Sequence, residues 1–484
     1  MPVPVISIAQ MREWESANWA AGRTEMEIIR RVGAVLARRA LELTRPDDAI
    51  LILAGKGHNG DDARAARDFL NDRRVEVLDV VAPESNLPEL EPALSQKPAL
   101  IIDGLFGIGL NRPLAGDWKK YIETVNRSGI PILAVDVPSG LNADTGEPTT
   151  PGAAIEAAVT LTIGAPKTGL LAPNASAFVG RLEVADDVGL TSCPQSSGLN
   201  WTLPEDFRNF PPRRSVSGHK GVFGHLAIIA GSLGFHGAAV LAASAAQRAQ
   251  PGLITLFTQE SVYHPIAAQL QAVMVNLWTP ELKLPDSTSA VLMGPGLAAP
   301  GLAGAMSLAA RRIWRDSLLP VIADASSLDW LPMGPSAKNA IRVLTPHPGE
   351  AARLLNTTQQ QVQENRPHTV REISRRFGNC WVVLKGNQTL VGRSASLRSD
   401  GASSPQEGEI FVNPSGNPHL AQGGSGDVLA GYLAGLVAQR PLQADVGKLI
   451  RYAVWQHGAA ADQLQATQAN WIIEDLIGEL GNAR

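Results

Sequence analysis

Cysteine is almost absent from this sequence of 484 residues, which contains only Cys193 and Cys380. The two lie far apart, and neither belongs to a CxxC pair or to another spacing typical of metal sites. A disulfide framework and a cysteine-ligated metal centre are therefore excluded as the basis of the fold. We expect both thiols to be buried or idle, as in a protein of the reducing cytosol.

The sequence also lacks a strong excess of charge, a long apolar run and a recognisable export signal. Its formal net charge is -4, so no basic surface predicts binding to nucleic acid or to anionic membranes. No apolar stretch approaches the roughly 18 residues that a membrane-spanning helix needs. The first ten residues have no basic region followed by an apolar core. The sequence thus predicts a cytoplasmic protein whose partners are small molecules, and it leaves a homo-oligomer open.

What the chain does have is an alternation of short apolar runs with polar or helical stretches. Residues 8–45 read as helical, and apolar runs follow at 50–54, 75–81, 100–103, 132–137 and 159–163. A second series of runs lies at 226–230, 253–257, 290–293, 321–324, 342–345 and 382–385. Two helices rich in small residues are expected at 237–249 and 427–437. Strands that alternate with helices predict parallel sheets with helices on both faces.

The stretch 190–218 separates the two series. It is rich in proline, serine and glycine, and the apolar periodicity stops there, so we interpret it as a linker. The chain is also too long for one ordinary domain. We therefore predict an α/β protein of two domains, over residues 1–205 and 213–484.

A glycine-rich turn follows the run 50–54 and reads Gly55-Lys-Gly-His-Asn-Gly60, with the spacing GxGxxG. Glycines let a backbone approach a phosphate, and a helix that starts there offers free N–H groups. The motif alone is weak evidence, and a plain strand-to-helix turn explains it as well. Asp79, the acidic residue that would bind a ribose, is expected inside a strand, and Asp61 and Asp62 add unfavourable negative charge.

Two further apolar runs end in aspartate, at Asp103 and Asp136, and a loop rich in glycine or proline follows each of them. If the two strands are neighbours in one sheet, both carboxylates and Asn59 converge at one edge. Such oxygen-rich clusters suit hard cations or acid–base catalysis. Alternatively, the carboxylates only cap the backbone of the loops, although three aligned strand ends favour a site.

The strongest pattern is Gly423-Gly-Ser-Gly-Asp427, which leads into a helix of small residues. Consecutive glycines before a helix form an anion-binding turn from backbone N–H groups. The aspartate could take a proton from a substrate hydroxyl while a phosphoryl group is held by that turn. A flexible loop with a capping aspartate is the alternative. Other strand ends also carry glycine or polar residues, at Gly296, Asp324, His347 and Lys385. Their presence favours a functional site over a flexible loop.

These motifs together resemble those of a known enzyme family. Residues 213–480 resemble the ribokinase-like NAD(P)H-hydrate dehydratases in His219-Lys-Gly221, Ala230-Gly-Ser232, Gly294-Pro-Gly-Leu297, Thr345-Pro-His-Pro-Gly-Glu350, Lys385-Gly386, Gly423-Gly-Ser-Gly-Asp427 and His457-Gly458. Residues 1–205 resemble the NAD(P)H-hydrate epimerases, which have a Rossmann-like fold, in Gly55-Lys-Gly57, Asn59, Asp62, 103–112 and 136–140. A fusion in this order is the layout of the bifunctional bacterial NAD(P)H-hydrate repair enzymes.

The resemblance implies a metabolite-repair function. The first domain, an isomerase, would interconvert the R and S epimers of hydrated NADH and NADPH. The second, a hydro-lyase, would phosphorylate the ring hydroxyl of the S epimer with ADP, and elimination of phosphate would restore NAD(P)H beside AMP. The resemblance also implies potassium in the epimerase domain and magnesium in the dehydratase domain.

The resemblance further assigns residues to the two sites. Asp427 and Asp136 would be catalytic, and Asn59, Asp103 and Ser139 would bind potassium. In the epimerase domain the hydrated cofactor would contact His58, Asn59, Gly60, Asp61, Asp62, Gly107, Ile108, Gly109, Leu110, Asn111, Arg112, Pro113 and Asp136. In the dehydratase domain it would contact Ala238, Gly296, His347 and Asp427. The nucleotide would contact Lys385, Gly386, Asn387, Gln388, Thr389 and Gly426.

Several positions of the epimerase loop depart from the family pattern. His58, Asp61 and Ala63 stand where the family usually has Asn, Gly and Gly, and Ile108 replaces a threonine. We expect the carboxylate of Asp61 to oppose phosphate binding at the helix N-terminus and so to weaken the epimerase. Two alternatives stay open: a small-molecule kinase on the same ribokinase-like scaffold, and a non-catalytic binding module in the first domain.

Overall fold

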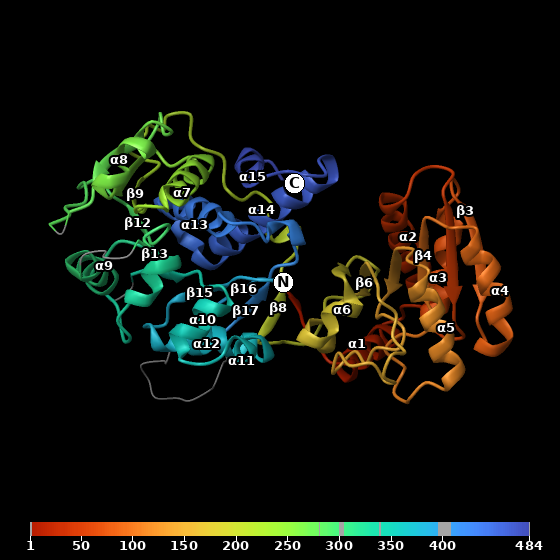
Figure 1. The fold of residues 1–484 in the computed structure, drawn as a ribbon. Coiled ribbons are helices and arrows are strands. Elements are labelled where there is room, and N and C mark those ends of the chain that lie inside the picture. Colours follow the sequence, from red (N-terminus) through yellow and green to blue (C-terminus); the bar gives the residue numbers. More distant parts are fainter. Residues whose placement is uncertain (1, 280, 300–303, 338–339, 395–407, 484) are drawn as a thin grey trace, which may run out of the picture. The chain divides into compact units, whose positions relative to one another are not determined.

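The structure is a computed structural model that describes residues 2–279, 281–299, 304–337, 340–394 and 408–483. Its contacts divide the chain into two compact units, Val3–Ser197 and Gly198–Arg484 (Figure 1). The division therefore falls earlier than the predicted boundary at 205–213. The reason is a short strand, β8 (Leu199–Trp201), which lies in the predicted linker but pairs with the sheet of the second unit.

The first unit is built on a parallel sheet with the strand order β3-β2-β4-β5-β6-β7. Its strands are β2 (Ala49–Ala54), β3 (Arg74–Asp79), β4 (Leu100–Gly104), β5 (Ile132–Val135), β6 (Val159–Ile163) and β7 (Arg181–Ala185). A two-residue strand, β1 (Val3–Pro4), precedes them. The apolar runs predicted for this half are confirmed as β2 to β6, and the sequence prediction missed β7.

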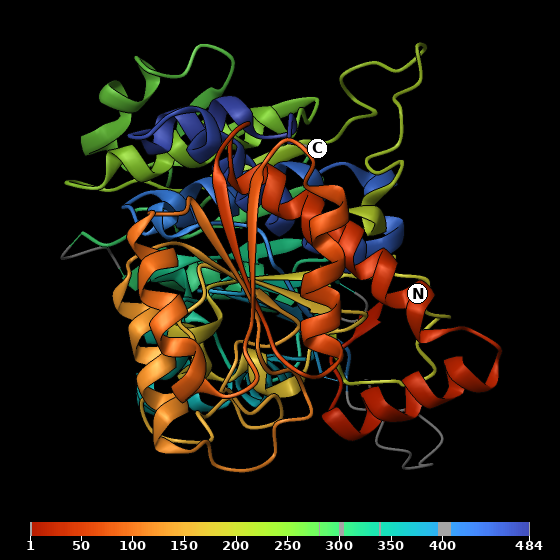
Figure 2. The ribbon, with the colours of Figure 1, turned by 90° about the vertical axis from the view of Figure 1, so that its right-hand side faces the viewer.

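Helices cover both faces of this sheet, because neighbouring strand residues point to opposite sides. Leu36 of α2 packs with Ile52 on one face, whereas Ile122 of α5 packs with Leu53 on the other. In Figure 2 the red and the lighter orange helices accordingly stand on opposite sides of the strands. The helices are α1 (Ile8–Ala20), α2 (Glu25–Leu43), α3 (His58–Ala66), α4 (Pro83–Ser95), α5 (Gly116–Arg127) and α6 (Ser176–Val179).

The helical prediction for residues 8–45 is confirmed as two helices, because the chain turns at Gly22, whose φ is 83°, and Thr24 then caps α2. One local prediction for this unit was wrong. Asp79 was expected inside a strand, but it is the last residue of β3 and is exposed. Its carboxylate therefore lies at the carboxyl edge of the sheet.

The second unit is built on a larger sheet with the strand order β8-β17-β16-β15-β14-β13-β12-β9-β10-β11. Its further strands are β9 (His225–Ile229), β10 (Leu253–Thr258), β11 (Met274–Leu277), β12 (Ala290–Met293), β13 (Val321–Ala323), β14 (Arg342–Leu344), β15 (Trp381–Leu384), β16 (Leu390–Gly392) and β17 (Ile410–Val412). β16 pairs antiparallel with both neighbours, and the other pairs in this order are parallel. All six apolar runs predicted for this half are confirmed as strands.

The helices of the second unit include the two predicted from their small residues. They are α7 (His236–Arg248), α8 (Glu260–Ala267), α9 (Gly304–Asp316), α10 (Pro348–Leu355), α11 (Gln359–Glu364), α12 (Arg366–Arg376), α13 (Ser425–Val437), α14 (Val446–Thr467) and α15 (Ile473–Glu479). Two α/β units on largely parallel sheets confirm the predicted fold class. Among the described residues, no helix is both long and apolar enough to cross a membrane. Both cysteines are free, and Cys380 is buried.

The order of strands reverses near one edge of each sheet. In the first unit β3 and β4 lie on opposite sides of β2, and in the second unit β10 and β12 lie on opposite sides of β9. Connections leave such a point in opposite directions, so a crevice forms at the carboxyl ends of the two strands. Ligand sites are therefore expected beyond β2 and β4, and beyond β9 and β12.

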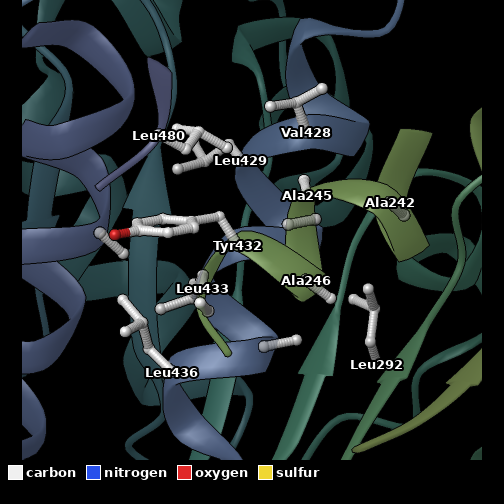
Figure 3. Close-up of a cluster of buried hydrophobic side chains, with 14 of the residues drawn as sticks. Ala242, Ala245, Ala246, Leu292, Val428, Leu429, Tyr432, Leu433, Leu436 and Leu480 are labelled. Carbon is white, nitrogen blue, oxygen red and sulfur yellow. The ribbon is translucent and has the colours of Figure 1, made fainter. Parts of the chain in front are cut away.

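The core of the second unit contains an unusually close helix pair, α7 on α13. Ala242 and Ala246 of α7 face α13, and Figure 3 shows the alanines of α7 directly beside the blue α13 helix. A Cβ on Gly431 of α13 would lie only 2.0 Å from the carbonyl oxygen of Ala242. The two backbones therefore touch, and glycine is required at that contact.

We predict that Gly431→Ala destabilises the second unit by about 1–3 kcal/mol, because the added methyl group must push the two helices apart. The matched control is Gly478→Ala in α15, where a Cβ would meet no atom within 4 Å. We expect that control to be neutral or stabilising by up to about 1 kcal/mol. Urea unfolding of the full-length protein measures both changes, and equal unfolding midpoints for the two variants would contradict the close contact.

Candidate functional sites

A cavity of about 790 Å³ opens in the first unit at the reversal of strand order. Its walls contain most residues predicted for the first site: His58, Asn59, Asp62, Gly107, Ile108, Gly109, Leu110, Asn111, Arg112, Pro113 and Asp136. Gly60, Asp61, Asp103 and Ser139 do not line it. Helix α1 adds Arg12, Glu15 and Trp19, which the sequence prediction did not include.

The GxGxxG turn packs the strand ends tightly around this cavity. A Cβ on Gly55 would lie 2.0 Å from the carbonyl oxygen of Leu105, in the loop after β4. A Cβ on Gly60 would lie 2.1 Å from the carbonyl oxygen of Gly55. These glycines are therefore explained by close packing, as the interpretation of a plain strand-to-helix turn predicts. Helix α3 still begins at His58, with its N-terminus at the cavity.

Asp61 is turned away from the cavity and paired with a cation. Arg64 Nη1 donates to Asp61 Oδ1 at 2.8 Å, and Arg64 Nε donates to Asp79 Oδ1 at 2.7 Å. The third contact of Arg64 is a hydrogen bond to the Gly55 carbonyl at 2.8 Å. The charge of Asp61 is thus opposed by Arg64, so the repulsion of phosphate expected from the sequence loses its physical basis.

Asp62, the next residue, has the opposite environment. Its side chain is more than nine-tenths buried at the wall of the cavity, and no described residue hydrogen-bonds to it. Burial raises the pKa of Asp62 well above its ordinary value, and the charges of Asp136, Asp61 and Glu15 raise it further. Burial and then the charge of Asp136 also raise the pKa of Glu15. The cavity therefore contains a carboxyl group, that of Asp62, whose environment favours the protonated form.

Asp136 lies directly after β5, in left-handed backbone with φ of 63°, at the wall of the cavity. One carboxylate oxygen, Oδ1, accepts hydrogen bonds from Thr162 Oγ1 at 3.1 Å and from the Ile163 N–H at 2.9 Å. The same oxygen accepts a bond from Nζ of Lys167, whose side chain is fully buried. The sequence prediction missed Lys167, although a lysine soon after an apolar strand end is a visible signal.

The three predicted potassium ligands surround one loop. Asp103 is fully buried, and its carboxylate accepts bonds from the Ser139 N–H at 2.8 Å, Ser139 Oγ at 2.6 Å and the Leu105 N–H at 3.2 Å. Asn59 Nδ2 donates to the Phe106 carbonyl at 3.0 Å, and the Phe106 N–H donates to Ser139 Oγ at 2.8 Å. Burial raises the pKa of Asp103 to about 6. The carboxylate therefore does cap the loop backbone, which was the simpler of the two sequence-based interpretations.

In the second unit, the predicted glycine-rich turn begins α13. Gly424, with φ of 97°, is the residue before the helix, and Asp427 lies in the first helical turn. A Cβ on Gly426 would lie 3.2 Å from Lys385 Nζ, so the ammonium group lies at the helix N-terminus. Free backbone N–H groups and an ammonium group together favour a bound phosphoryl group.

A buried polar cluster surrounds that ammonium group. Lys385 Nζ is 2.8 Å from Asp324 Oδ1 and 3.8 Å from Glu350 Oε2, and Thr345 Oγ1 donates to Asp324 Oδ1 at 2.7 Å. Burial raises the pKa of Asp427 to about 7; the charges of Asp324 and Glu350 also raise it, whereas Lys385 lowers it. A carboxyl group that titrates near neutral pH is suited to accept a proton from a hydroxyl.

The other residues predicted to contact the hydrated cofactor lie in α7, in the loop after β12 and at the start of α10. Gly296 has φ of 66°, and a Cβ there would lie 3.0 Å from the Cβ of Ala238, so the two residues are neighbours. His347 caps α10, because its Nδ1 accepts the Gly349 N–H at 3.0 Å. Its ring is therefore fixed by this bond, and about half of the side chain is exposed.

The loop predicted to bind the nucleotide is held by an arginine that the sequence prediction missed. Gly386 and Gln388 both have positive φ, 137° and 52°, so the loop turns sharply. Arg366, the first residue of α12, donates to the carbonyls of Asn387 and Leu384, the latter at 3.2 Å. No carboxylate of the described residues pairs with this guanidinium. An arginine at a helix start has no sequence signal that connects it to a loop about twenty residues later.

A doubly wound sheet, a helix N-terminus with an ammonium group and a buried carboxylate together define an enzyme of phosphoryl chemistry. A sequence profile of the NAD(P)H-hydrate dehydratase family matches residues 226–480, and a profile described as the N-terminus of YjeF-related proteins matches residues 78–169. The chain belongs to the family of bifunctional NAD(P)H-hydrate repair enzymes.

Relatives resemble the chain over nearly its whole length. The bifunctional NAD(P)H-hydrate repair enzyme Nnr of Coxiella burnetii is 33% identical over 480 residues, which are 94% of this chain and 93% of the relative. The Nnr of Escherichia coli is 33% identical over 86% of this chain and 81% of its own. An ADP/ATP-dependent NAD(P)H-hydrate dehydratase of Bacillus subtilis, crystallised with ATP and Mg2+, is 28% identical with a TM-score of 0.49, over 58% of this chain and 96% of its own.

The raised pKa of Asp427 predicts that this residue destabilises the unliganded fold at alkaline pH. The carboxylate form is disfavoured in the folded protein, so the cost is present above pH 7 and disappears as the pH falls towards 4. Asp427→Asn should therefore raise the free energy of unfolding at pH 8 by about 1 kcal/mol or more, and the gain should shrink in acid. The exposed Asp286→Asn controls for the loss of one charge, and an equal effect of both variants would contradict the prediction.

Proposed function

We propose that the second unit restores NADH and NADPH from the S epimers of their hydrates with the consumption of ADP. The observation that carries this proposal is the placement of Asp427 and the Lys385 ammonium group at the N-terminus of α13. Membership of the repair-enzyme family supports the same chemistry. The proposal takes the nucleotide contacts to be Lys385, Gly386, Asn387, Gln388, Thr389 and Gly426, and the substrate contacts to be Ala238, Gly296, His347 and Asp427.

In this reaction Asp427 takes the proton from the ring hydroxyl, whose oxygen then attacks the terminal phosphorus of ADP. The bond between that phosphorus and the bridging oxygen breaks, and AMP leaves. The N–H groups of the turn 424–426 and the ammonium group of Lys385 stabilise the phosphoryl group as it moves. Loss of a ring proton with departure of phosphate then restores the double bond. The net reaction converts the hydrate and ADP into NAD(P)H, AMP and phosphate.

Magnesium fits this site as an ion that binds together with the phosphates of the nucleotide. Magnesium usually binds one or two carboxylates together with phosphate oxygens and water, so it needs no larger protein cluster. Among the described residues no group of three or more His, Cys, Asp or Glu side chains is arranged for a metal ion. Asp324 or Glu350, which flank the Lys385 ammonium group, would hold the ion, which neutralises charge on the phosphates when bound.

We propose that the first unit interconverts the R and S epimers in its cavity. Asp136 is the proposed base, and the substrate contacts proposed from the resemblance are those that line the cavity. The pairing of Asp61 with Arg64 removes the objection raised by the altered loop, because the extra carboxylate is neither free nor directed at the cavity. This favours a catalytic first unit over a non-catalytic binding module.

Potassium fits beside Asp103 for an electrostatic reason. This carboxylate is fully buried, and no lysine, arginine or histidine of the described residues forms an ion pair with it. A buried charge without a counter-ion is costly, so a monovalent cation near Asp103, Asn59 and Ser139 would stabilise the site. When bound, the cation would supply positive charge next to the cavity wall.

The proposed base is tested by Asp427→Asn. Loss of a general base should reduce dehydration of the S epimer with ADP by about 10²–10⁴, measured as recovery of NADH absorbance. The epimerase rate and the affinity for ADP should stay within a few-fold of wild type, which serves as the internal control for folding. Near-normal dehydration by the variant would eliminate Asp427 as the base.

The neighbouring residues Asp61 and Asp62 allow a matched test of the first site. Asp61→Asn removes only a half-exposed ion pair, worth roughly 0.2–1 kcal/mol, so kcat/KM for epimerisation should change by less than about fivefold. Asp62→Asn changes a buried carboxyl group on the cavity wall and should cost at least about tenfold. If the two variants lose equal activity, or Asp61→Asn loses more, the assignment of the cavity to substrate is wrong.

A further inference from the structure

Lys167 occupies an unusual place for a lysine. Its side chain is fully buried in the first unit, in the loop just after β6. Nζ donates to the Ile163 carbonyl at 2.9 Å, to Thr162 Oγ1 at 3.1 Å and to Asp136 Oδ1. All three donor positions of the ammonium group are thus used, and its charge is met by one carboxylate. A buried lysine is costly unless it is paired in this way.

The contacts of Asp136 are distributed unequally between its two oxygens. Oδ1 accepts from Lys167, Thr162 and Ile163, whereas no described residue hydrogen-bonds to Oδ2. Because Asp136 lines the cavity, the oxygen without a protein partner is the one available to a ligand. The left-handed backbone of Asp136, with φ of 63°, is strained for a residue with a side chain, and the three bonds hold it there.

We propose that Lys167 is a positioning residue for epimerisation: it holds Asp136 as a carboxylate and directs Oδ2 into the cavity. The inference rests on the proposed epimerase function of the first unit. Two other carboxyl groups face the same cavity, Glu15 from α1 and Asp62 from α3. Neither forms an ion pair with a lysine or arginine in the described part of the chain, so the direct ion pair with Lys167 distinguishes Asp136 from the other two. When neighbouring carboxyl groups have different environments, their pKa values differ, so one can act as a base and another as an acid.

The test compares Lys167→Met, Asp136→Asn and the double variant in full-length protein. Conversion of the pure R epimer is followed by chromatography without ADP, so that dehydration cannot remove the product. Lys167→Met should lower kcat by about 10–10³-fold with little change in KM. The double variant should be no slower than Asp136→Asn alone, because a residue that acts only through Asp136 has no effect once that carboxylate is gone. Dehydration of the S epimer by the second unit controls for protein quality.

Three outcomes decide the matter. Wild-type-like kcat in Lys167→Met, or losses that multiply in the double variant, would overturn the positioning role and leave the epimerase proposal intact. A wild-type protein that does not epimerise would overturn both. If Lys167→Met does not fold, Lys167→Gln replaces it, because the amide can still donate to Asp136 without a charge. That variant should also lose kcat with little change in KM, and retention of full activity would again refute the inference.

Discussion

Both sites depend on strand ends that approach each other too closely for any side chain. At the reversal in the first sheet, a Cβ on Gly55 would lie 2.0 Å from the Leu105 carbonyl. In the second sheet, a Cβ on Gly294 would lie 1.7 Å from the carbonyl of Asp324. The absence of a side chain lets the adjacent loops turn directly at the sheet edge. The polar residues of those loops therefore gather at a few neighbouring strand ends in each unit instead of spreading along the edge.

The two sites also handle buried charge in the same way. Each places one buried carboxylate against a lysine, Asp136 against Lys167 and Asp324 against Lys385. Each then leaves another carboxyl group, Asp62 or Asp427, where burial raises the pKa above its ordinary value. In acid–base catalysis, one group often keeps its charge while a neighbouring carboxyl group gains and loses a proton. Two unrelated sheets within one chain thus use the same electrostatic solution.

The sequence predicted the architecture well where the runs were apolar, since each predicted run became a strand and all of them except β3 are largely buried. It failed for β8, β16 and β17, which have three residues each, and for the longer β7 and β11, which contain charged or polar residues among the apolar ones. Residues at strand ends were predicted because parallel strands bring their carboxyl ends together. The partners Lys167 and Arg366 were not, because their contacts depend on side-chain direction across loops. Site assignments taken from the family resemblance stay predictions.

The contact between α7 and α13 has a consequence for the chemistry of the second site. Ala242 lies one helical turn after Ala238, a proposed substrate contact, and Gly431 lies one turn after Asp427. The backbones meet at these two positions, so the distance between the helix starts is determined by main-chain thickness rather than by adjustable side chains. The helix pair therefore acts as a rigid spacer that sets the distance between Ala238, the proposed substrate contact, and Asp427, the proposed base. Reaction rates are sensitive to displacements of about 1 Å. Because the two backbones are in contact, substitutions of neighbouring side chains should leave this spacing unchanged.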